Sequence, residues 1–398
     1  MAEGPLHGIT VLDLSSVILG PMTGQYLGDM GADVIKVESP EGDVTRTIGP
    51  RRSEGMGALY LANNRNKRSI VLDLKSPGGR AALGRLATRA DVVLHSIRTE
   101  AAARIGLSYR ALTGRNPRLI YCHVRGFGDD GPYGGRPAYD DIIQALSGLA
   151  MLQTIAAGEP RYVPSIIADK VTAVHAAYAI ALALFHRERT GRGQEVAVPM
   201  LETMVAFNLQ EHLGGAVFDP AIGRMGYEPI RNGMRRPFPT RDGYLCFLPY
   251  NDLHWARFFE RTGRADLAAD PDFSTMRGRQ ANLGRVWDEV GREVARRTTA
   301  EWTALLEGTD IPNAVLNDLE DLLDDPHLAA TGFWKVFEHP TEGMLRLPGN
   351  PIGMPASPPG ISRLPPVLGE HTAEVLGEFG FAAEEIEALC PHLEESKC

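Results

Sequence analysis

The sequence predicts an α/β fold with a doubly wound parallel sheet, and two observations support this prediction. Short runs rich in Val, Ile and Leu alternate with helical segments through the first 130 residues, a pattern that is typical of βαβ units. The chain also has 43 glycines and 28 prolines, which indicates many turns and short connections. With 398 residues, it is long enough for two or three domains of about 150 residues each.

Each element of the N-terminal half follows from its own residue pattern. The expected strands are short aliphatic runs at 9–14, 32–38, 69–74, 91–97 and 118–127. The expected helices between and after them lie at 21–31, 77–90, 100–114, 139–151 and 170–190. A further strand at 194–200 leads into a helix at 201–213. Within the first helical segment, Gly20, Gly24 and Gly28 recur every four residues. We expect them to let that helix pack closely on the sheet rather than to cradle a nucleotide phosphate, since GxGxxG is absent.

The residue pattern of the chain changes from about residue 225. We expect a strand at 241–250, mostly helical structure with charged faces over 252–330, and two closing helices at 371–380 and 384–390. Residues 349–366 hold six prolines, so this segment is predicted to be an extended connector.

Charge and hydropathy exclude several classes of protein. A net charge of −9 argues against a protein that binds nucleic acid through general electrostatics. The longest uncharged apolar stretch has 15 residues, 171–185, which falls short of the ~20 needed to span a bilayer. No signal-peptide pattern is seen at the N-terminus. The four cysteines are scattered without CxxC spacing, which predicts free thiols and no metal site. We therefore expect a cytoplasmic protein with neither a nucleic-acid nor a membrane partner.

Asp169 stands directly before the longest predicted helix, and its position supports two interpretations. Asp is a preferred N-cap, worth about 1 kcal/mol, and the residue pattern alone favours this structural role. The same position suits a nucleophile, because a helix N-terminus favours the anion and aims the carboxylate out of a rigid element. The helix itself is apolar on nearly all sides and is therefore predicted to be buried.

A group of basic residues lies near the expected carboxyl ends of the strands, where doubly wound sheets bind their ligands. Each one alone is typical of a solvated surface charge, but the set fits a polyphosphate ligand in an otherwise acidic protein. The members are Arg46, Arg65, Lys67, Arg68, Lys75, Arg98, Arg104 and Arg136.

The histidines offer no catalytic triad. His123 lies in a predicted strand, His175 on the predicted buried helix and His371 in the C-terminal segment. No GxSxG, HExxH or Walker sequence is present, so hydrolase, zinc-protease and P-loop interpretations have no support.

An ordered set of segments extends over nearly the whole chain: 11–46, 64–79, 131–152, 168–170, 187–202 and 365–380. In this order they resemble the class III CoA-transferase family, which includes formyl-CoA transferase and carnitine CoA-transferase. Residues 205–345 match the family only in their general residue pattern and share no motif with it. The resemblance implies a Rossmann-like large domain from 1–204, an inserted α+β small domain at 225–335, and a connector and C-terminal return to the large domain at 349–398. It also implies an interlocked homodimer.

The resemblance further implies an acyl-CoA:carboxylate CoA-transferase, with Asp169 as the catalytic carboxylate. Asp169 would form an acyl anhydride and then an aspartyl-CoA thioester, with acyl-CoA and a small carboxylic acid as substrates. No permanently bound cofactor or metal is implied. Coenzyme A contacts are expected from Val17, Leu72, Lys75, Ser96, Ile97, Arg104 and Met200, with Tyr139 beside the active site.

The sequence departs from formyl-CoA transferase at several positions. Ile18 replaces a glutamine, Ser96 and Ile97 replace an asparagine–phenylalanine pair, and Pro137 replaces a lysine. The glycine-rich lid loop of that enzyme has no counterpart. Specificity for oxalate and formyl-CoA is therefore not implied.

Two alternative functions stay open. A 2-methylacyl-CoA racemase needs two acid/base groups beside the α-carbon, and the His that related racemases use would fall at Tyr139, whose phenol is a poor base at neutral pH. A catalytically silent CoA-binding protein is the other alternative, against which the presence of Asp169 argues.

Overall fold

The computed structural model describes residues 3–231, 233 and 235–390, which form two compact units. The large unit lies within Met1–Gln153, Pro160–Leu209 and Ala330–Cys398, and the small unit comprises Thr154–Glu159 and Gln210–Ala329. In chain order, most of the large unit comes first, the small unit follows, and the C-terminal part belongs to the large unit again.

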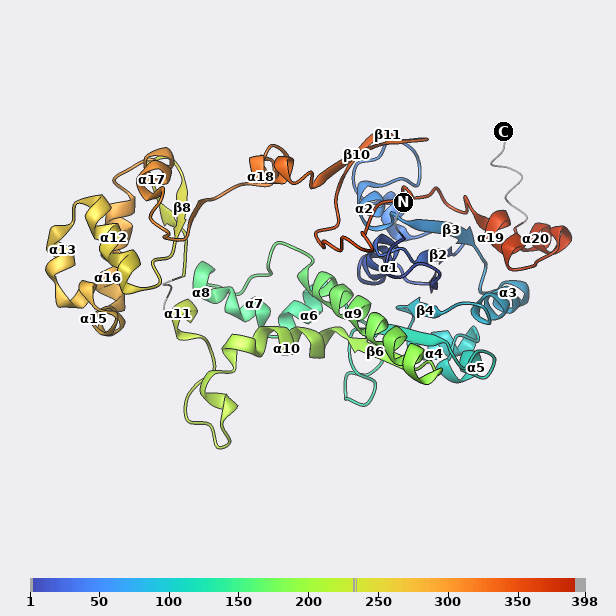
Figure 1. Cartoon of the computed structure of the whole chain (residues 1–398). Coiled ribbons are helices and arrows are strands. Elements are labelled where there is room, and N and C mark those ends of the chain that lie inside the picture. Colours follow the sequence, from blue (N-terminus) through green and yellow to red (C-terminus); the bar gives the residue numbers. More distant parts are fainter. Residues whose placement is uncertain (1–2, 232, 234, 391–398) are drawn as a thin grey trace. The chain divides into compact units, whose positions relative to one another are not determined.

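A six-stranded, wholly parallel sheet forms the centre of the large unit. The strand order is β3-β2-β1-β4-β5-β6, which confirms the predicted doubly wound fold (Figure 1). This order reverses between β1 and β4, and in such sheets ligands bind beyond the carboxyl ends of the strands at that point. The strands are β1 (Thr10–Asp13), β2 (Asp33–Glu38), β3 (Lys67–Val71), β4 (Val92–His95), β5 (Ile120–Arg125) and β6 (Glu195–Pro199).

Helices cover both faces of this sheet, and each face has its own apolar core. On β1, Leu12 belongs to one core and its neighbour Val11 to the other, which explains why the strands are continuous apolar runs. The first core includes side chains of α3 (Pro77–Ala87), α4 (Thr99–Arg104), α5 (Tyr109–Thr113), α19 (Thr372–Glu378) and α20 (Ala383–Leu389). The second includes side chains of α1 (Leu19–Asp29), α6 (Asp140–Leu146), α9 (Ile167–Thr190) and α10 (Met200–His212).

Close approach of α1 to the sheet depends on its glycines, as predicted. A Cβ atom on Gly20 would lie 2.1 Å from the Cβ of Ser15, and one on Gly24 would lie 2.7 Å from a carboxylate oxygen of Asp13. Real Cβ atoms do not approach so closely, so larger residues would push α1 away from β1.

Two predicted helices are each divided in the structure. The segment 100–114 forms α4 and α5, with Gly106 between them at φ +76°. The segment 139–151 forms α6 and α7 (Leu149–Leu152), with Gly148 between them at φ +82°. Glycine adopts this left-handed conformation without a steric penalty, and it breaks both helices. Short helices α2 (Ala58–Asn63) and α8 (Thr154–Ala157) were not expected.

The prediction that the longest helix is buried on nearly all sides is wrong. One face of α9 packs into the second core, but Val174, Tyr178, Leu182 and Phe185 are each 50–61% exposed. Their spacing of four, four and three residues forms a single stripe along the helix. The helix has 24 residues and, by length and composition, could cross a membrane. Core helices of soluble proteins meet the same test, so this is weak evidence.

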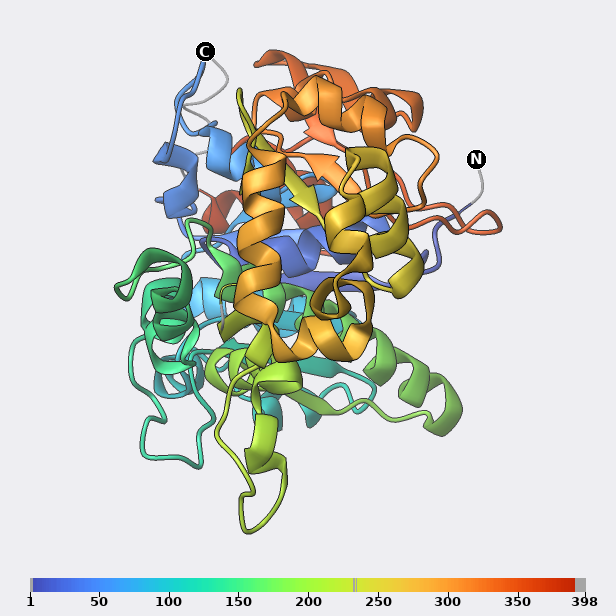
Figure 2. The same cartoon turned by 90° about the vertical axis from the view of Figure 1, so that its left-hand side faces the viewer.

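The small unit combines a three-stranded antiparallel sheet with a cluster of helices (Figure 2, yellow to orange). Its core is rich in aromatic residues, among them Trp255, Phe258 and Trp302. The strands are β7 (Phe238–Pro239), β8 (Tyr244–Phe247) and β9 (Asn313–Val315). The helices include α11 (Glu228–Arg231), α12 (Asp252–Thr262), α13 (Ala265–Ala269), α14 (Pro271–Ser274), α15 (Met276–Ala281), α16 (Leu283–Val294), α17 (Thr299–Leu306) and α18 (Pro326–Ala330).

The last part of the large unit begins with a hairpin that the sequence did not predict, β10 (Trp334–His339) and β11 (Gly343–Pro348). Residues 349–366 then contain no helix or strand, as predicted. Hydrogen bonds fix this connector to the large unit, including one from the Asn66 N–H to the Arg363 carbonyl at 2.9 Å.

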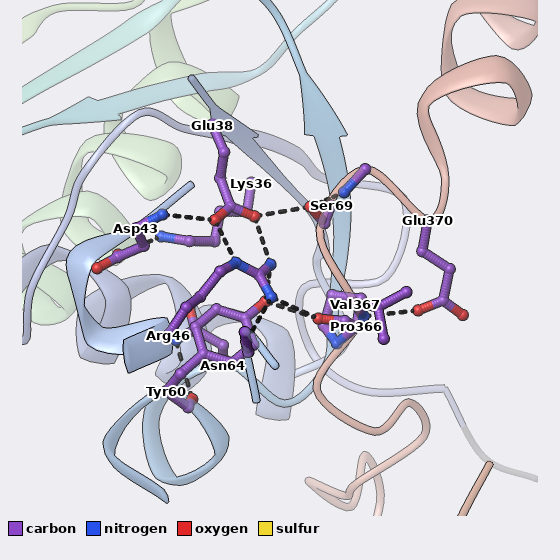
Figure 3. A network of polar contacts seen from close by, with 12 residues as sticks. Lys36, Glu38, Asp43, Arg46, Tyr60, Asn64, Ser69, Pro366, Val367 and Glu370 are labelled. Atoms are coloured by element: carbon purple, nitrogen blue, oxygen red, sulfur yellow. Dashed lines mark hydrogen bonds and ion pairs between the residues drawn. The ribbon is translucent and has the colours of Figure 1, made fainter. Parts of the chain in front are cut away.

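Buried ion pairs lie at the ends of the N-terminal strands, and a hydrogen bond connects this network to the C-terminal segment (Figure 3). Lys36 pairs with Asp43 at 2.9 Å and Arg46 with Glu38 at 2.7 Å. Arg46 also donates to the carbonyl of Pro366 at 3.3 Å, and Ser69 donates to Glu38 at 2.7 Å.

These pairs correct the prediction of one polyphosphate-binding set. Besides Arg46, the side chains of Arg65, Lys67 and Arg68 pair with Asp29, Asp13 and Asp33 respectively. All four cations are at most 4% exposed. Their charges are neutralised inside the fold, so they are structural and do not provide a phosphate site.

Candidate active site

A cavity of about 310 Å³ lies at the carboxyl ends of four adjacent strands, β1, β4, β5 and β6. Its wall includes Val17 after β1, Ser96 after β4, Gly126 after β5 and Met200 after β6, together with Asp169. An adjoining cavity of about 730 Å³ shares Arg98 and Arg136 with the first and is also lined by Arg104. The site therefore lies where a doubly wound sheet is expected to bind its ligand.

Asp169 is not the N-cap of its helix, which corrects the structural interpretation of this residue. α9 begins at Ile167, so Asp169 is its third residue. The capping role belongs to Asp140, whose Oδ1 accepts the N–H groups of Ala168 at 2.6 Å and Asp169 at 3.1 Å. Gln144 donates to the other oxygen of Asp140 at 2.6 Å. The carboxylate of Asp169 is consequently not used for capping and lines the cavity.

The surroundings of Asp169 make it a poorly solvated carboxylate. Burial, and then the nearby charge of Asp140, raise its pKa to about 6, while a hydrogen bond from the Leu19 N–H works in the opposite direction. Leu19 is the first residue of α1, so the carboxylate lies at two helix N-termini, where anions are favoured. The prediction that the helix N-terminus keeps this group ionised is thus qualified, because burial outweighs it and the group ionises near pH 6.

The loop between β1 and α1 has an unusual backbone at the cavity wall. Val17 adopts φ +71°, a conformation that is strained for a β-branched residue. Its N–H donates to Asp43 at 3.3 Å, and Lys36 donates to the carbonyl of Ser15 at 3.1 Å. The buried Lys36–Asp43 pair therefore holds both sides of Val17, close to Leu19 and its hydrogen bond to Asp169.

The structure brings some of the sequence-predicted site residues together and leaves others apart. Val17, Ser96, Tyr139, Asp169 and Met200 all line the first cavity, and Arg104 lines the second. Leu72 instead lies in the first apolar core and is 1% exposed. Ile97 packs against the same core and Lys75 is exposed; neither of them lines the two cavities.

Among the polar residues of the cavity wall that the sequence did not identify are His123 and Arg125. Both lie on β5, two residues apart, and residues at this spacing share a face of a strand. Their place near the carboxyl end of a central strand was the signal that could have identified them. Burial, followed by the charge of Arg125, lowers the pKa of His123 to about 4, so its imidazole is neutral at pH 7.

Within the described residues, no group of three His, Cys, Asp or Glu side chains is placed to hold a metal ion. Of the four cysteines, Cys122, Cys246 and Cys390 are free thiols, and Cys398 lies outside the described residues.

The raised pKa of Asp169 predicts a pH-dependent effect on stability. We expect Asp169→Asn to increase the free energy of unfolding by about 3 kcal/mol above pH 6, because each pKa unit is worth about 1.4 kcal/mol and an Asp in an unfolded chain ionises near 3.9. The native state holds the proton more tightly, so ionisation penalises the fold. This penalty is absent below about pH 4 and complete above about pH 6. Urea unfolding of both proteins from pH 4.5 to 8, with the exposed Asp141→Asn as control, measures it. A difference that does not grow with pH would contradict the buried environment of Asp169.

Fold and site together define an α/β enzyme with a buried carboxylate, Asp169, on the cavity wall at the switch point of a doubly wound sheet. The model of CoA-transferase family III matches residues 6–372, and the chain belongs to this family. The family and enzyme class inferred from the resemblance are thereby confirmed.

Several relatives of known name are similar to the chain over almost its whole length. Succinate–glutarate CoA-transferase of Agrobacterium fabrum is 36% identical, covering 94% of this chain and 96% of that protein. Succinyl-CoA:mesaconate CoA-transferase of Haloarcula hispanica is also 36% identical, covering 95% and 97%. Among solved structures, a CAIB/BAIF family protein from Brucella suis is 32% identical with a TM-score of 0.82, covering 95% of this chain and all of that one.

Proposed function

We propose that this chain moves CoA from an acyl-CoA to a carboxylic acid through covalent intermediates on Asp169. The observation that carries the proposal is the placement of Asp169: a carboxylate that is 9% exposed lines the cavity at the switch point and is not used for capping. With a pKa of about 6, it is ionised at pH 7 yet poorly hydrated, which favours nucleophilic attack.

The reaction proceeds in four exchanges at the carboxylate. An oxygen of Asp169 attacks the thioester carbonyl, the C–S bond breaks, and CoA thiolate leaves an acyl-aspartyl anhydride. The thiolate then attacks the aspartyl carbonyl, releases the first acid and forms an aspartyl-CoA thioester. The acceptor carboxylate attacks this thioester to form a second anhydride and free thiolate. The thiolate finally attacks the new acyl carbon, which yields the new acyl-CoA and regenerates Asp169.

A backbone donor supports the negative charge that develops on the Asp169 carbonyl oxygen when the thiolate or the acceptor carboxylate attacks it. The Leu19 N–H, which donates to the Asp169 carboxylate, belongs to the first turn of α1. Donors that are already fixed before the reaction stabilise developing oxyanions at little cost in reorganisation. Val17 and the Lys36–Asp43 pair keep this turn in place.

CoA phosphates would bind in the larger cavity, where Arg98, Arg104 and Arg136 provide positive charge in an otherwise acidic protein. We expect Arg104→Ala to raise the KM for acyl-CoA about 10-fold with little change in kcat, because a phosphate contact stabilises ground and transition states alike. The effect should shrink with dephospho-CoA esters if Arg104 contacts the 3′-phosphate. Steady-state kinetics beside Arg118→Ala, an exposed arginine outside both cavities, measure this, and an unchanged KM in Arg104→Ala would contradict the assignment.

Lys75, Leu72 and Ile97 remain proposed CoA contacts on the resemblance alone. Lys75→Ala should raise the same KM if its side chain meets the ligand.

The acceptor is proposed to be a small carboxylic acid. By their printed names, relatives act on succinate, glutarate and mesaconate, and a formyl-CoA:oxalate CoA-transferase of Streptomyces avermitilis is 32% identical. Incubating the enzyme with acyl-CoA donors and a panel of mono- and dicarboxylic acids, then detecting new CoA esters by mass, tests the proposal. Formation of no new CoA ester from any pair would overturn it.

The same incubation in D₂O separates this function from a racemase. Racemisation needs a second base beside the α-carbon. Tyr139 is 71% exposed, and Arg136, near it in sequence, lies over the ring of Tyr133 instead, 4.8 Å from its centroid. His123 is on the cavity wall, but its pKa of about 4 makes it a weak base. We therefore expect no α-deuteration of 2-methylacyl-CoA while CoA exchanges readily. Deuteration at a rate that rivals CoA exchange would favour the racemase.

The proposed protein partner is a second copy of this chain, in the cytoplasm. The exposed stripe of α9, with Tyr178 and Phe185 each 61% exposed, supports a partner surface, because contiguous exposed apolar side chains mark interaction sites.

A further inference from the structure

Two buried polar atoms on the cavity wall have no hydrogen-bond partner. They are Nε2 of His123 and Nε of Arg125, and both residues line the cavity that contains Asp169. Buried polar groups in proteins are nearly always hydrogen-bonded, and an exception requires an explanation such as a ligand. Four such atoms occur in the described part of the chain, and two of them lie on this single wall.

The neighbouring polar groups on the same face of the sheet satisfy one another. His95 and Tyr121 lie 2.6 Å apart through Nε2 and the phenol oxygen, and Tyr121 donates to the carbonyl of Leu107 at 2.7 Å. The Ile97 N–H donates to the other nitrogen of His95 at 3.2 Å. His123 stacks on His95, with ring centroids 4.4 Å apart. The side chains of His95 and Tyr121 thus have hydrogen-bond partners. His123 and Arg125, which lie nearer the carboxyl end of β5 on the cavity wall, each keep one atom without a partner.

Both unpartnered atoms can act as donors. The Nε of arginine is always a donor, and a neutral imidazole can donate from Nε2. Arg125 forms an ion pair through a terminal nitrogen with Asp129, which lines the same cavity. The side chain of Asp129 is 43% exposed, unlike the buried partners of Arg46, Arg65 and Lys67, and the pair leaves Nε of Arg125 without a partner. His123 is 3% exposed, and its Nε2 is buried. The two donors belong to residues two apart on β5, which share one face of the strand, and donors of this kind are the usual partners of a carboxylate.

We propose that His123 and Arg125 form a subsite for a second carboxylate, at the far end of the acyl group whose thioester carbonyl meets Asp169. The inference deepens the proposed function, on which it rests, and assigns dicarboxylic acids as the substrate class. The phosphates of CoA are assigned to the larger cavity, which Arg104 lines in addition to the two arginines, Arg98 and Arg136, that line both cavities. A monocarboxylic acyl group would leave both donors unpaired, and buried donors left unpaired are the strongest basis for rejecting an analogue.

Binding to the Asp169→Asn variant tests the subsite without turnover. The probes are succinyl-CoA and butyryl-CoA, which have four acyl carbons each and differ in the terminal carboxylate. We expect succinyl-CoA to bind about 10- to 100-fold more tightly, the range for hydrogen bonds to a charged group. Adding Arg125→Met should reduce that ratio to about 2-fold or less, and adding His123→Phe, which keeps a ring against His95, should reduce it in part. Butyryl-CoA and free CoA should bind all variants alike.

The control is Arg118→Gln, an exposed arginine that precedes β5 and pairs with Glu188 outside the cavity, which should keep the full ratio. Arg125→Lys, which retains charge but lacks Nε, should restore only part of it. An equal affinity for both esters, a ratio that Arg125→Met and His123→Phe leave unchanged, or no binding of either ester would overturn the subsite.

Measuring CoA transfer by the enzyme that retains Asp169 shows whether the subsite or the proposed function is wrong. Transfer of CoA to acids with no preference for dicarboxylates overturns the subsite and leaves the function standing. Absence of transfer to any acid, with the binding preference present, overturns the function and leaves the subsite standing.

Discussion

Asp169→Asn is expected to abolish CoA transfer, with a loss of at least about 10⁴-fold in kcat, as for the removal of other covalent nucleophiles. The amide cannot form an anhydride, whereas its oxygen can still accept the Leu19 N–H that Asp169 accepts. The variant should therefore fold, and it should bind acyl-CoA with nearly unchanged affinity. Asp169→Ala should lose activity to the same degree.

Initial rates of CoA-ester formation, with equilibrium binding of the donor, measure both parts of this prediction. Asp141→Asn is the matched control, because Asp141 is an exposed acid in the first turn of α6 outside the cavity and its variant should retain full activity. Near-normal transfer by Asp169→Asn would show that another group is the nucleophile.

Asp43→Asn is expected to lower the free energy of unfolding by about 3–5 kcal/mol, the cost of leaving a buried charge without its partner. Lys36 is completely buried and pairs with Asp43 at 2.9 Å. Burial alone would raise the pKa of Asp43, but Lys36 and hydrogen bonds from Thr45 lower it, so this carboxylate is charged at neutral pH. Loss of the pair should also release the Ser15 carbonyl and reduce kcat, since Val17 and Leu19 line the cavity.

Urea unfolding at pH 7.5 measures the stability loss. Glu54→Gln, which removes an exposed ion pair with Arg51, should cost less than about 1 kcal/mol. Replacing Lys36 and Asp43 together by Met and Leu should recover much of the stability but not the activity. An Asp43→Asn protein as stable as Glu54→Gln would contradict the role given to the pair.

Local sequence patterns predicted most of the large unit. β-Branched and aliphatic runs set the strands, and Gly191, in a left-handed conformation at φ +75°, ends α9 where expected. What local patterns could not show is which side of an apolar helix another molecule or element covers. The exposed stripe with Val174 and Leu182 has the same composition as the buried face of α9.

The basic residues show why the site was only partly predictable. Arg68 and Arg104 satisfy the same local rule, proximity to the end of a strand. Arg68 pairs with Glu378, which is 310 residues away, and Lys67 pairs with Asp13, 54 residues away. Only the three-dimensional fold separates neutralised cations from those that face the cavity.

The resemblance identified Asp169 as the catalytic candidate. Its interpretation as an N-cap was wrong because the capping group comes from a residue that is distant in sequence. The capping carboxylate of Asp140 is 28 residues before Ala168, whose N–H it accepts. His123 and Arg125 were missed because one histidine on an apolar strand carries no signal until its surroundings show that Nε2 lacks a partner.

Trapping the covalent intermediate tests the central claim most directly. The enzyme is incubated with an acyl-CoA, treated with hydroxylamine, digested and analysed by mass. We predict a hydroxamate on Asp169, formed from the anhydride or the aspartyl-CoA thioester, that depends on the acyl-CoA and is absent in Asp169→Asn. A hydroxamate on another residue, or none during active turnover, would contradict covalent catalysis by Asp169.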